Sequence, residues 1–369
     1  MKIPFNKPYL TGKELEYIND AVLRGKISGD GYYTHKCHRF FQERFGFKKC
    51  LLTTSCTDAL EMAAILCDIQ PGDEVIVPSY TFVSTANAFV LRGAKIVFAD
   101  SREDHPGIDE SKIESLITSR TKVIVPVHYA GVACDMDIIM DIAKRHNLLV
   151  VEDSAQAIDS FYKGKPLGGI GHLGCFSFHE TKNIQCGEGG MLVINDERFC
   201  KRAEIIWEKG TNRAEFFRGE VNKYGWVDIG SSFLPSELMA AFLWAQAENI
   251  EDIQRRRSAI WKWYNENAEE LFPNYSFTKP FIPEYSTNNA HMFYLVLVSI
   301  EERTHFIDKM RKKGVFPVFH YLSLYRSPFY RDKHDGKELI NSDRFENCLV
   351  RLPFYYELDE KRVKKLITI

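Results

Sequence analysis

Short apolar runs alternate with amphipathic segments between residues 53 and 194, and this alternation constrains the fold more than any other feature. The apolar runs predict strands at 74–78, 95–99, 123–127, 148–152, 174–178 and 191–194. The segments between them predict helices, among them 57–67, 84–91, 109–118 and 135–146. Because continuous apolar strands separated by helices are typical of buried parallel strands, we expect an α/β fold whose mainly parallel sheet is covered on both faces.

The pattern changes beyond residue 235. A long helical region at 235–271 is broken by Phe272-Pro273-Asn274. A strand-like run at 292–299, a helix at 301–313, a strand-like run at 315–320 and a helical C-terminus follow. This order predicts a large domain over residues 1–250 and a smaller α+β domain over residues 251–369.

Composition excludes several classes of partner. The chain has 369 residues and a formal net charge of −2, which argues against a nucleic-acid or anionic-membrane surface. No run approaches the roughly 18 apolar residues of a membrane span, and the N-terminus lacks the pattern of a signal peptide. The nine cysteines include no Cys-x-x-Cys pair, which suits reduced thiols and predicts neither a disulfide frame nor a metal site. We therefore expect a cytoplasmic protein.

Lys182 is the strongest candidate for catalysis. It lies in Phe176-Ser177-Phe178-His179-Glu180-Thr181-Lys182-Asn183, and the glycine-rich turn Gly187-Glu188-Gly189-Gly190 follows. Upstream, an apolar strand runs into Glu152-Asp153-Ser154-Ala155-Gln156. Because ligands bind at the carboxyl ends of parallel strands, Lys182 and Asp153 are expected to meet. A lysine can hold a carbonyl cofactor as a Schiff base while a carboxylate faces the ring nitrogen of the cofactor.

Each of these residues also has a simpler interpretation. Asp153 could cap the next helix, and His179 is more often a structural hydrogen-bonding residue than a catalyst. Gln156, three residues after Asp153, could bond a phenolic oxygen of the cofactor. Phe82 follows a strand and could stack on a ring or pack on the sheet.

Hydroxyl residues mark a candidate phosphate site. The run Thr53-Thr54-Ser55-Cys56-Thr57-Asp58 lies where a loop enters a helix, so free amides and the helix dipole would favour a phosphate. Ordinary N-capping is the competing interpretation.

Together these segments resemble the DegT/DnrJ/StrS family of pyridoxal-phosphate sugar aminotransferases. The likeness covers nearly the whole chain and includes Pro4-Phe5-Asn6-Lys7-Pro8, Pro71-Gly72-Asp73-Glu74-Val75 and Pro78-Ser79-Tyr80-Thr81-Phe82 besides the runs around Asp153 and Lys182. It implies an aspartate-aminotransferase-type fold (pyridoxal-phosphate fold type I), with the cofactor on the large domain, and a homodimer with active sites at the interface. The roles that it implies are Lys182 as the Schiff-base residue, Asp153 at the ring nitrogen, Gln156 at O3′, Phe82 on the ring face, and Ser177, Thr57 and the amide of Cys56 at the phosphate.

The chain departs from the family pattern at two positions. Cys56 replaces the usual glycine, and Gly230-Ser231-Ser232-Phe233-Leu234 replaces a run with asparagine and arginine. The cross-subunit phosphate contact of that asparagine would pass to Ser232, to water or to another residue.

Three further runs resemble one branch of the family, which makes dTDP-4-amino-4,6-dideoxygalactose for enterobacterial common antigen. They are Ser55-Cys56-Thr57, residues 127–134 and Lys209-Gly210-Thr211-Asn212-Arg213. The resemblance implies amino transfer from L-glutamate to C4 of dTDP-4-keto-6-deoxy-D-glucose, with Arg213, His320 and Tyr321 as nucleotide-sugar contacts. A gluco product and a 3-keto sugar stay open as alternatives. More distant ones are a sugar dehydratase, which typically carries histidine at the position of Lys182, and a non-catalytic regulator.

Overall fold

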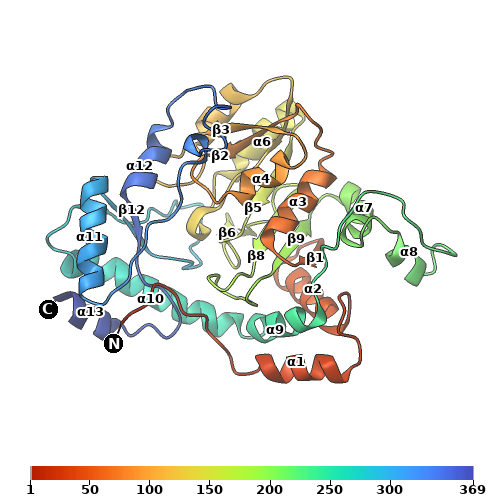
Figure 1. The fold of residues 1–369 in the computed structure, drawn as a ribbon, viewed down its shortest axis with the longest axis horizontal. Helices are drawn as coiled ribbons and strands as arrows, with labels where there is room; N and C mark the ends of the chain where they lie inside the picture. The colour runs from red at the N-terminus through yellow and green to blue at the C-terminus, as the bar shows by residue number, and fades with distance from the viewer. Residues whose placement is uncertain (1, 369) are drawn as a thin grey trace.

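A seven-stranded sheet forms the centre of the molecule (Figure 1), and the computed structural model describes residues 2–368. The strand order is β1-β9-β8-β5-β4-β2-β3. β9 runs antiparallel to its two neighbours, and the other pairs are parallel, which confirms the expected mainly parallel sheet. The strands are β1 (Lys49–Thr53), β2 (Glu74–Pro78), β3 (Lys95–Ala99), β4 (Thr121–Ile124), β5 (Leu149–Asp153), β8 (Leu173–Ser177) and β9 (Gly190–Ile194).

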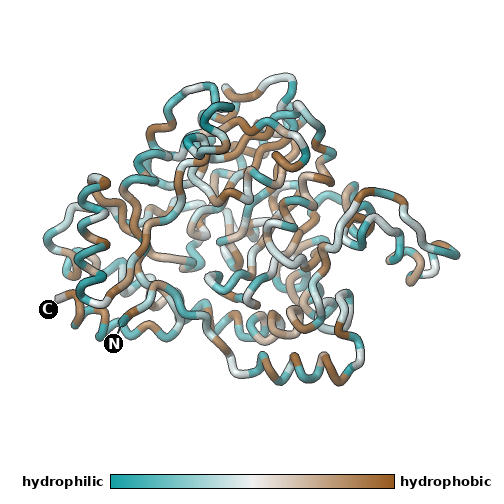
Figure 2. The backbone as a smooth tube through the Cα atoms, in the orientation of Figure 1, coloured by the Kyte–Doolittle hydropathy of each residue, from teal (hydrophilic) through white to brown (hydrophobic). Residues whose placement is uncertain are grey.

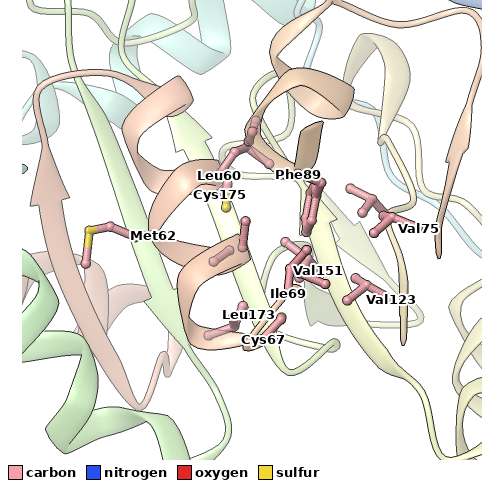
Figure 3. Packing of buried hydrophobic residues seen from close by; sticks show 14 of the residues in the cluster. Leu60, Met62, Cys67, Ile69, Val75, Phe89, Val123, Val151, Leu173 and Cys175 are labelled. Atoms are coloured by element: carbon pink, nitrogen blue, oxygen red, sulfur yellow. The ribbon is translucent and has the colours of Figure 1, made fainter. Parts of the chain in front are cut away.

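Helices cover both faces of this sheet. One face packs against α3 (Cys56–Leu66), α4 (Ser84–Val90) and α7 (Glu197–Trp207). The other packs against α2 (Tyr32–Phe45) and α9 (Glu237–Ala247) at one end and α5 (Glu110–Ile113) and α6 (Met136–His146) at the other. Figure 3 shows Phe89 of α4 beside Val75, Val123 and Val151 of the strands, and Leu60 of α3 beside Cys175 of β8. The strands are apolar throughout because both of their faces are buried.

A smaller antiparallel sheet lies beside the main one. It contains β10 (Phe277–Thr278), β11 (Tyr294–Leu297) and β12 (Leu349–Arg351), in that order. The helices α10 (Ile250–Leu271), α11 (Ile300–Lys312) and α13 (Glu360–Thr368) share one apolar core with it, and α12 (Ile340–Cys348) lies beside them. Figure 2 shows apolar residues concentrated in the interior strands, whereas the outer helices alternate between polar and apolar residues.

The remaining elements are short or peripheral. α1 (Glu14–Leu23) lies along α9, and α8 (Arg213–Phe217) belongs to an arm that projects from the body (Figure 1). β6 (Phe161–Tyr162) and β7 (Lys165–Pro166) form a small ribbon. Short 3₁₀ turns occur at Glu114–Leu116, Tyr129–Gly131 and Leu324–Arg326.

Several predicted bounds differ from the structure, and two predicted elements differ in kind. The run 315–320 is not a strand: it holds two isolated bridges, Val315 with Ile3 and Val318 with Arg351, and Pro317 between them has no N–H to continue a ladder. The long helix 235–271 is two helices, α9 and α10, separated at Glu248 and Asn249. α10 begins at Ile250, and a domain boundary at residue 250 stays a prediction. Within the described part of the chain no helix is both long and apolar enough to cross a membrane.

Candidate active site

Nine of the eleven predicted site residues line one cavity of about 800 Å³ at the carboxyl ends of the parallel strands. They are Cys56, Thr57, Phe82, Asp153, Gln156, Ser177, Lys182, His320 and Tyr321. The first seven come from the large sheet and its loops, and His320 and Tyr321 come from the C-terminal part of the chain. The cavity therefore lies between the two sheets.

Lys182 sits on the loop that joins β8 to β9. The neck of this loop is closed by backbone hydrogen bonds from Phe178 to Gly189 and from Cys186 to Phe178. Asn183 anchors the loop to α10 and to residue 289. Its side-chain amide donates to Gln254 Oε1 and to the carbonyl of residue 289, both at 2.8 Å. Burial lowers the pKa of the Lys182 amine. The amine thus loses its proton more readily than a surface lysine does.

Asp153 is buried at the end of β5 and is held by two donors. Thr85 Oγ1 donates to Asp153 Oδ2 at 2.7 Å, and the amide of Ala155 donates to Oδ1 at 3.1 Å. Thr81 lies 2.9 Å from Thr85 and donates to it, since the proton of Thr85 is used by Asp153. Burial raises the pKa of Asp153, so this carboxylate needs a cation to stay ionised.

The Gln156 side chain is fixed at both ends of its amide. Oε1 accepts from the amide of Ala130 at 2.6 Å, and Nε2 donates to the hydroxyl of Tyr321 at 2.9 Å. Ala130 has a φ of 57°, an uncommon conformation for a residue with a side chain, and this conformation directs its N–H toward Gln156. Because Gln156 Oε1 is already used, its Nε2 is the group that can donate to a ligand in the cavity.

A cradle for an anion lies at the start of α3. Ser55 caps this helix by accepting from the amide of Asp58, which leaves the amides of Cys56 and Thr57 free. Thr57 Oγ1 is 2.7 Å from Ser84 Oγ, and Ser177 faces the same cavity. Amides at a helix N-terminus together with hydroxyls form an ordinary phosphate site.

Gly190 allows this cradle to form. A Cβ at Gly190 would lie 2.3–2.5 Å from the backbone of Ser55 and Cys56. The absence of a side chain there lets β9 pass directly beneath the start of α3. The glycine-rich turn predicted from the sequence is thus a close approach of two backbones.

His320 and Tyr321 form the opposite wall. Their rings are stacked with centroids 3.5 Å apart, and Tyr129 Oη lies 2.6 Å from His320 Nδ1. Burial raises the pKa of Tyr129 and lowers that of His320 well below its usual range. Tyr129 therefore donates to Nδ1, and His320 is a neutral imidazole whose Nε2 carries the proton.

His291 has the opposite tautomer. Its Nδ1 is 2.9 Å from Asn183 Oδ1, an oxygen that can only accept. His291 Nδ1 therefore donates, and its Nε2 is an acceptor. His291 lines the same cavity, and burial lowers its pKa well below the usual range.

The buried pair of His128 and Glu152 fixes the end of β5 next to the site. Glu152 accepts from the amides of residues 168, 170 and 171 and from His128 Nε2 at 2.9 Å. His128 and Glu152 are both fully buried. These contacts fix the end of β5 and hence the direction of the Asp153 side chain.

Two predicted residues do not line the cavity of their own chain. Arg213 is exposed on α8, where its guanidinium lies 5.2 Å from the ring of Phe217. Ser232 is exposed, and its backbone bridges to Glu208 at the base of the arm. Their roles stay predictions that require a second copy of the chain.

The site also includes residues that were not predicted from the sequence, and four of them bear on its chemistry. Thr85 orients Asp153, Ser84 contacts Thr57, and His291 and Arg351 line the cavity. No local pattern in the sequence indicates any of them, since Thr85 is 68 positions from Asp153 and Ser84 is 27 positions from Thr57.

The residues fit pyridoxal phosphate. A protonated ring nitrogen would supply the cation that buried Asp153 needs, the amine of Lys182 is poised to bond to an aldehyde, and the start of α3 can bind the phosphate. This fold with such a site defines the class of pyridoxal-phosphate-dependent aminotransferases of fold type I.

Comparison with known proteins narrows the class. The chain belongs to the DegT/DnrJ/EryC1/StrS aminotransferase family, whose model matches residues 8–369. It is 33% identical to GDP-perosamine synthase of Escherichia coli O157:H7, over 98% of this chain and 95% of that protein. It is 30% identical to the spore coat polysaccharide biosynthesis protein SpsC of Bacillus subtilis, over 99% of this chain and 95% of that protein.

The fold agrees with solved structures as well. The PLP form of the aminotransferase Spr1654 from Streptococcus pneumoniae superposes with a TM-score of 0.89 and 27% identity, covering 100% of this chain and 97% of that one. The protein is therefore a pyridoxal-phosphate-dependent sugar aminotransferase.

Proposed function

We propose that the protein transfers the amino group of L-glutamate to C4 of dTDP-4-keto-6-deoxy-D-glucose. The products are 2-oxoglutarate and a dTDP-4-amino-4,6-dideoxyhexose, preferably of galacto configuration, for a cytoplasmic step in the synthesis of cell-surface polysaccharide. The carrying observation is that the amine of Lys182, its pKa lowered by burial, shares one large cavity with the buried carboxylate of Asp153.

The residues of the cavity have separate roles in the proposed reaction. Pyridoxal phosphate, when bound, supplies an electron sink that makes the α-hydrogen of an amino acid acidic. Asp153, oriented by Thr85, holds the ring nitrogen protonated, and Gln156 Nε2 donates to the phenolic oxygen. Lys182 Nζ takes the α-proton of glutamate and, in the second half of the reaction, gives a proton to C4 of the sugar.

Binding of the cofactor requires three further groups. Thr57, Ser177 and the amide of Cys56 contact the phosphate, and Phe82, which is 55% exposed, covers one face of the ring. Cys56 can replace the glycine usual in the family because only its amide is used.

The nucleotide sugar extends from the cavity toward a second copy of the chain. His320 and Tyr321 present an N–H and a hydroxyl in the cavity wall, whereas Arg213 and Ser232 reach the site of the partner in a homodimer. Exposed apolar side chains on the projecting arm support this dimer: Phe217 is 67% exposed and Trp226 is 84% exposed.

The experiment is to incubate purified protein with glutamate and dTDP-4-keto-6-deoxy-D-glucose and to assign C4 of the product by NMR. An amino group at C4 with galacto configuration is expected. A gluco product, or an amino group at C3 from a 3-keto substrate, would correct the specificity. Since one relative is named a GDP-perosamine synthase, a parallel incubation with GDP-4-keto-6-deoxymannose tests the nucleotide.

The same incubation separates the more distant alternatives. A dehydratase would release a sugar hydroxyl without incorporating nitrogen from glutamate. A non-catalytic regulator would leave both substrates unchanged. Lys182 disfavours a dehydratase, which typically carries histidine at this position. The presence of Lys182, Asp153 and Gln156 in one cavity disfavours a regulator, in which the site would have decayed.

A further inference from the structure

Three histidines line the cavity, and one of them offers it an acceptor that the protein does not use. They are His179, His291 and His320. The amide of Thr181 donates to Nδ1 of His179 at 3.3 Å, and a tyrosine hydroxyl donates to Nδ1 of His320. His291 donates from its Nδ1, so its lone pair is on Nε2, and among residues 2–368 nothing donates to that nitrogen. His291 therefore differs from the other two histidines in having a free acceptor.

The orientation of the His291 ring is fixed from two sides. Asn183 Oδ1 lies 2.9 Å from Nδ1, and the amide of Asn183 cannot be turned round because its Nδ2 already donates to two carbonyl oxygens. The guanidinium of Arg257 donates to the carbonyls of residues 290 and 291 at 3.1 and 2.6 Å. Ring and backbone are both anchored, so the direction of Nε2 is fixed as well.

Within the described part of the chain, the charges that act on His291 are all positive. They belong to Lys182, Arg257 and Arg351, and together with burial they lower the pKa of His291 well below its usual range, which keeps the ring neutral. Lys182 has the largest effect of the three. Its Nζ makes no hydrogen bond to any of residues 2–368. A donor without an acceptor and an acceptor without a donor thus line the same cavity.

The chemistry of Lys182 needs such an acceptor. A free lysine amine rotates about several bonds, whereas proton transfer requires its lone pair to point at the reacting carbon. When the C–H bond of the amino donor breaks, the proton bonds to Nζ, and one N–H of the resulting ammonium can be donated to His291. His291 keeps its single proton on Nδ1 throughout, so no charge moves onto the imidazole.

We propose that His291 is a positioning residue, which accepts a hydrogen bond from Nζ of Lys182 whenever this amine is not bonded to the cofactor. The hydrogen bond directs the amine toward the carbon from which it takes a proton or to which it gives one. This inference rests on the catalytic role of Lys182 in the proposed aminotransfer and adds the residue that orients the lysine.

Two substitutions separate the two nitrogens of the ring. His291→Asn can keep an N–H near the position of Nδ1 for Asn183, but it has no atom at the position of Nε2. His291→Gln can place its Oε1 acceptor near the position of Nε2, but it lacks the donor to Asn183. If Nε2 positions Lys182, His291→Asn should be the more stable variant in thermal unfolding and the slower enzyme. His291→Gln should be the less stable variant and the faster enzyme.

Single-turnover kinetics of the holoenzyme measure the rates. In His291→Asn the limiting rate constants with glutamate and with the keto sugar should each fall on the order of 10- to 100-fold, the range for a misplaced reacting group. The apparent dissociation constants of both substrates should stay within about twofold, because the lysine and not the substrate contacts His291. His291→Gln should keep both rate constants within about threefold of the wild type.

Cofactor-free protein gives a readout independent of turnover. A hydrogen bond to Nε2 favours the ammonium form of Lys182, so loss of this bond should lower the pKa of the amine further. The rate of covalent uptake of pyridoxal phosphate should therefore level off about one pH unit lower in His291→Asn than in the wild type. His291→Gln should follow the wild-type curve.

His172→Asn is the matched control. His172 is half-buried, its Nδ1 accepts from the amide of Val150 at 3.0 Å, and it does not line the cavity. This control should match the wild type in its rates and in its uptake curve.

Wild-type rates in His291→Asn would overturn the proposal. A His291→Gln enzyme slower than His291→Asn would also overturn it, because the rate would then follow stability, and so would a loss confined to substrate affinity. Failure of the wild type to react with glutamate would instead refute the proposed function, and the uptake curves of cofactor-free protein would still test His291.

Discussion

At the scale of single residues, the site is a set of side chains whose orientations and hydrogen-bonding roles are fixed by their neighbours. Asp153 depends on Thr85, Gln156 on the strained amide of Ala130, and His320 on the hydroxyl of Tyr129. The cavity thus offers a ligand a definite donor or acceptor at each position. Such preorganisation lowers the cost of orienting groups during the reaction.

The residues that could be predicted from the sequence are those with a local signal. Lys182 and Asp153 each follow a strand and belong to a recognisable run. Thr85 and Arg351 do not: Thr85 is 68 positions from its partner Asp153, and Arg351 ends a strand that was not predicted. Long-range contacts of this kind depend on how the two sheets pack.

The lowered pKa of Lys182 leads to a prediction about cofactor binding. The amine must be neutral to bond to the aldehyde, and its ordinary pKa is 10.5. Since burial lowers this pKa, the neutral fraction at any pH below 10.5 is larger than for a free lysine. The rate at which cofactor-free protein takes up pyridoxal phosphate, followed by absorbance, should therefore rise with pH and level off below 10.5. A rate still rising at pH 10.5 would contradict it, and Lys182→Ala should show no covalent uptake.

At the scale of elements, the strands were easier to predict than the long helix. The predicted bounds of β2 and β3 agree with the structure, because each is a continuous apolar run between polar turns. α9 and α10 were predicted as one helix, since nothing as strong as a proline or glycine marks the break at Glu248 and Asn249. β12 was missed because it has only three residues.

The contact between β9 and α3 gives a prediction at this scale. Gly190→Ala places a methyl group against the backbone of Ser55 and Cys56 and should cost roughly 1–3 kcal/mol of folding stability. Because the displaced backbone includes the anion cradle, cofactor affinity should fall roughly tenfold or more, a factor equal to about 1.4 kcal/mol. Thermal unfolding and a cofactor titration measure the two effects.

Gly187→Ala is the control for that change. A methyl group there meets no atom within 4 Å, although its φ of +79° strains any side chain. This variant should lose some stability and keep its cofactor affinity. Equal affinity losses in the two variants would show that the close approach at Gly190 is not what shapes the cradle.

At the scale of the whole molecule, the arm around α8 is the part that a single chain does not explain. It projects from the body in Figure 1 and exposes Trp226 and Phe217 to solvent. The arm also carries Arg213, which the family resemblance assigns to the binding of the nucleotide sugar. Both observations agree if the arm crosses to a partner, as the family resemblance implies.

Trp226→Ser tests this dimer. Removing a tryptophan that anchors an interface weakens association by about 2 kcal/mol or more, so the dissociation constant should rise roughly 30-fold. The fraction of dimer, measured by sedimentation, and the specific activity should fall together as the variant is diluted. Val298, which directly follows β11 and is 67% exposed, is the control, and Val298→Ser should change neither the dissociation constant nor the activity. If Trp226→Ser stays dimeric on dilution, the arm is not part of the dimer interface.

The central claim is that Lys182 and its cofactor carry an amino group from glutamate to a keto sugar, and the visible spectrum of the holoenzyme tests it most directly. Glutamate alone should abolish the absorption of bound pyridoxal phosphate and release one 2-oxoglutarate per site. Subsequent addition of dTDP-4-keto-6-deoxy-D-glucose should restore the absorption and yield one amino sugar per site. A spectrum that glutamate leaves unchanged, or that no nucleotide-linked keto sugar restores, would contradict the account.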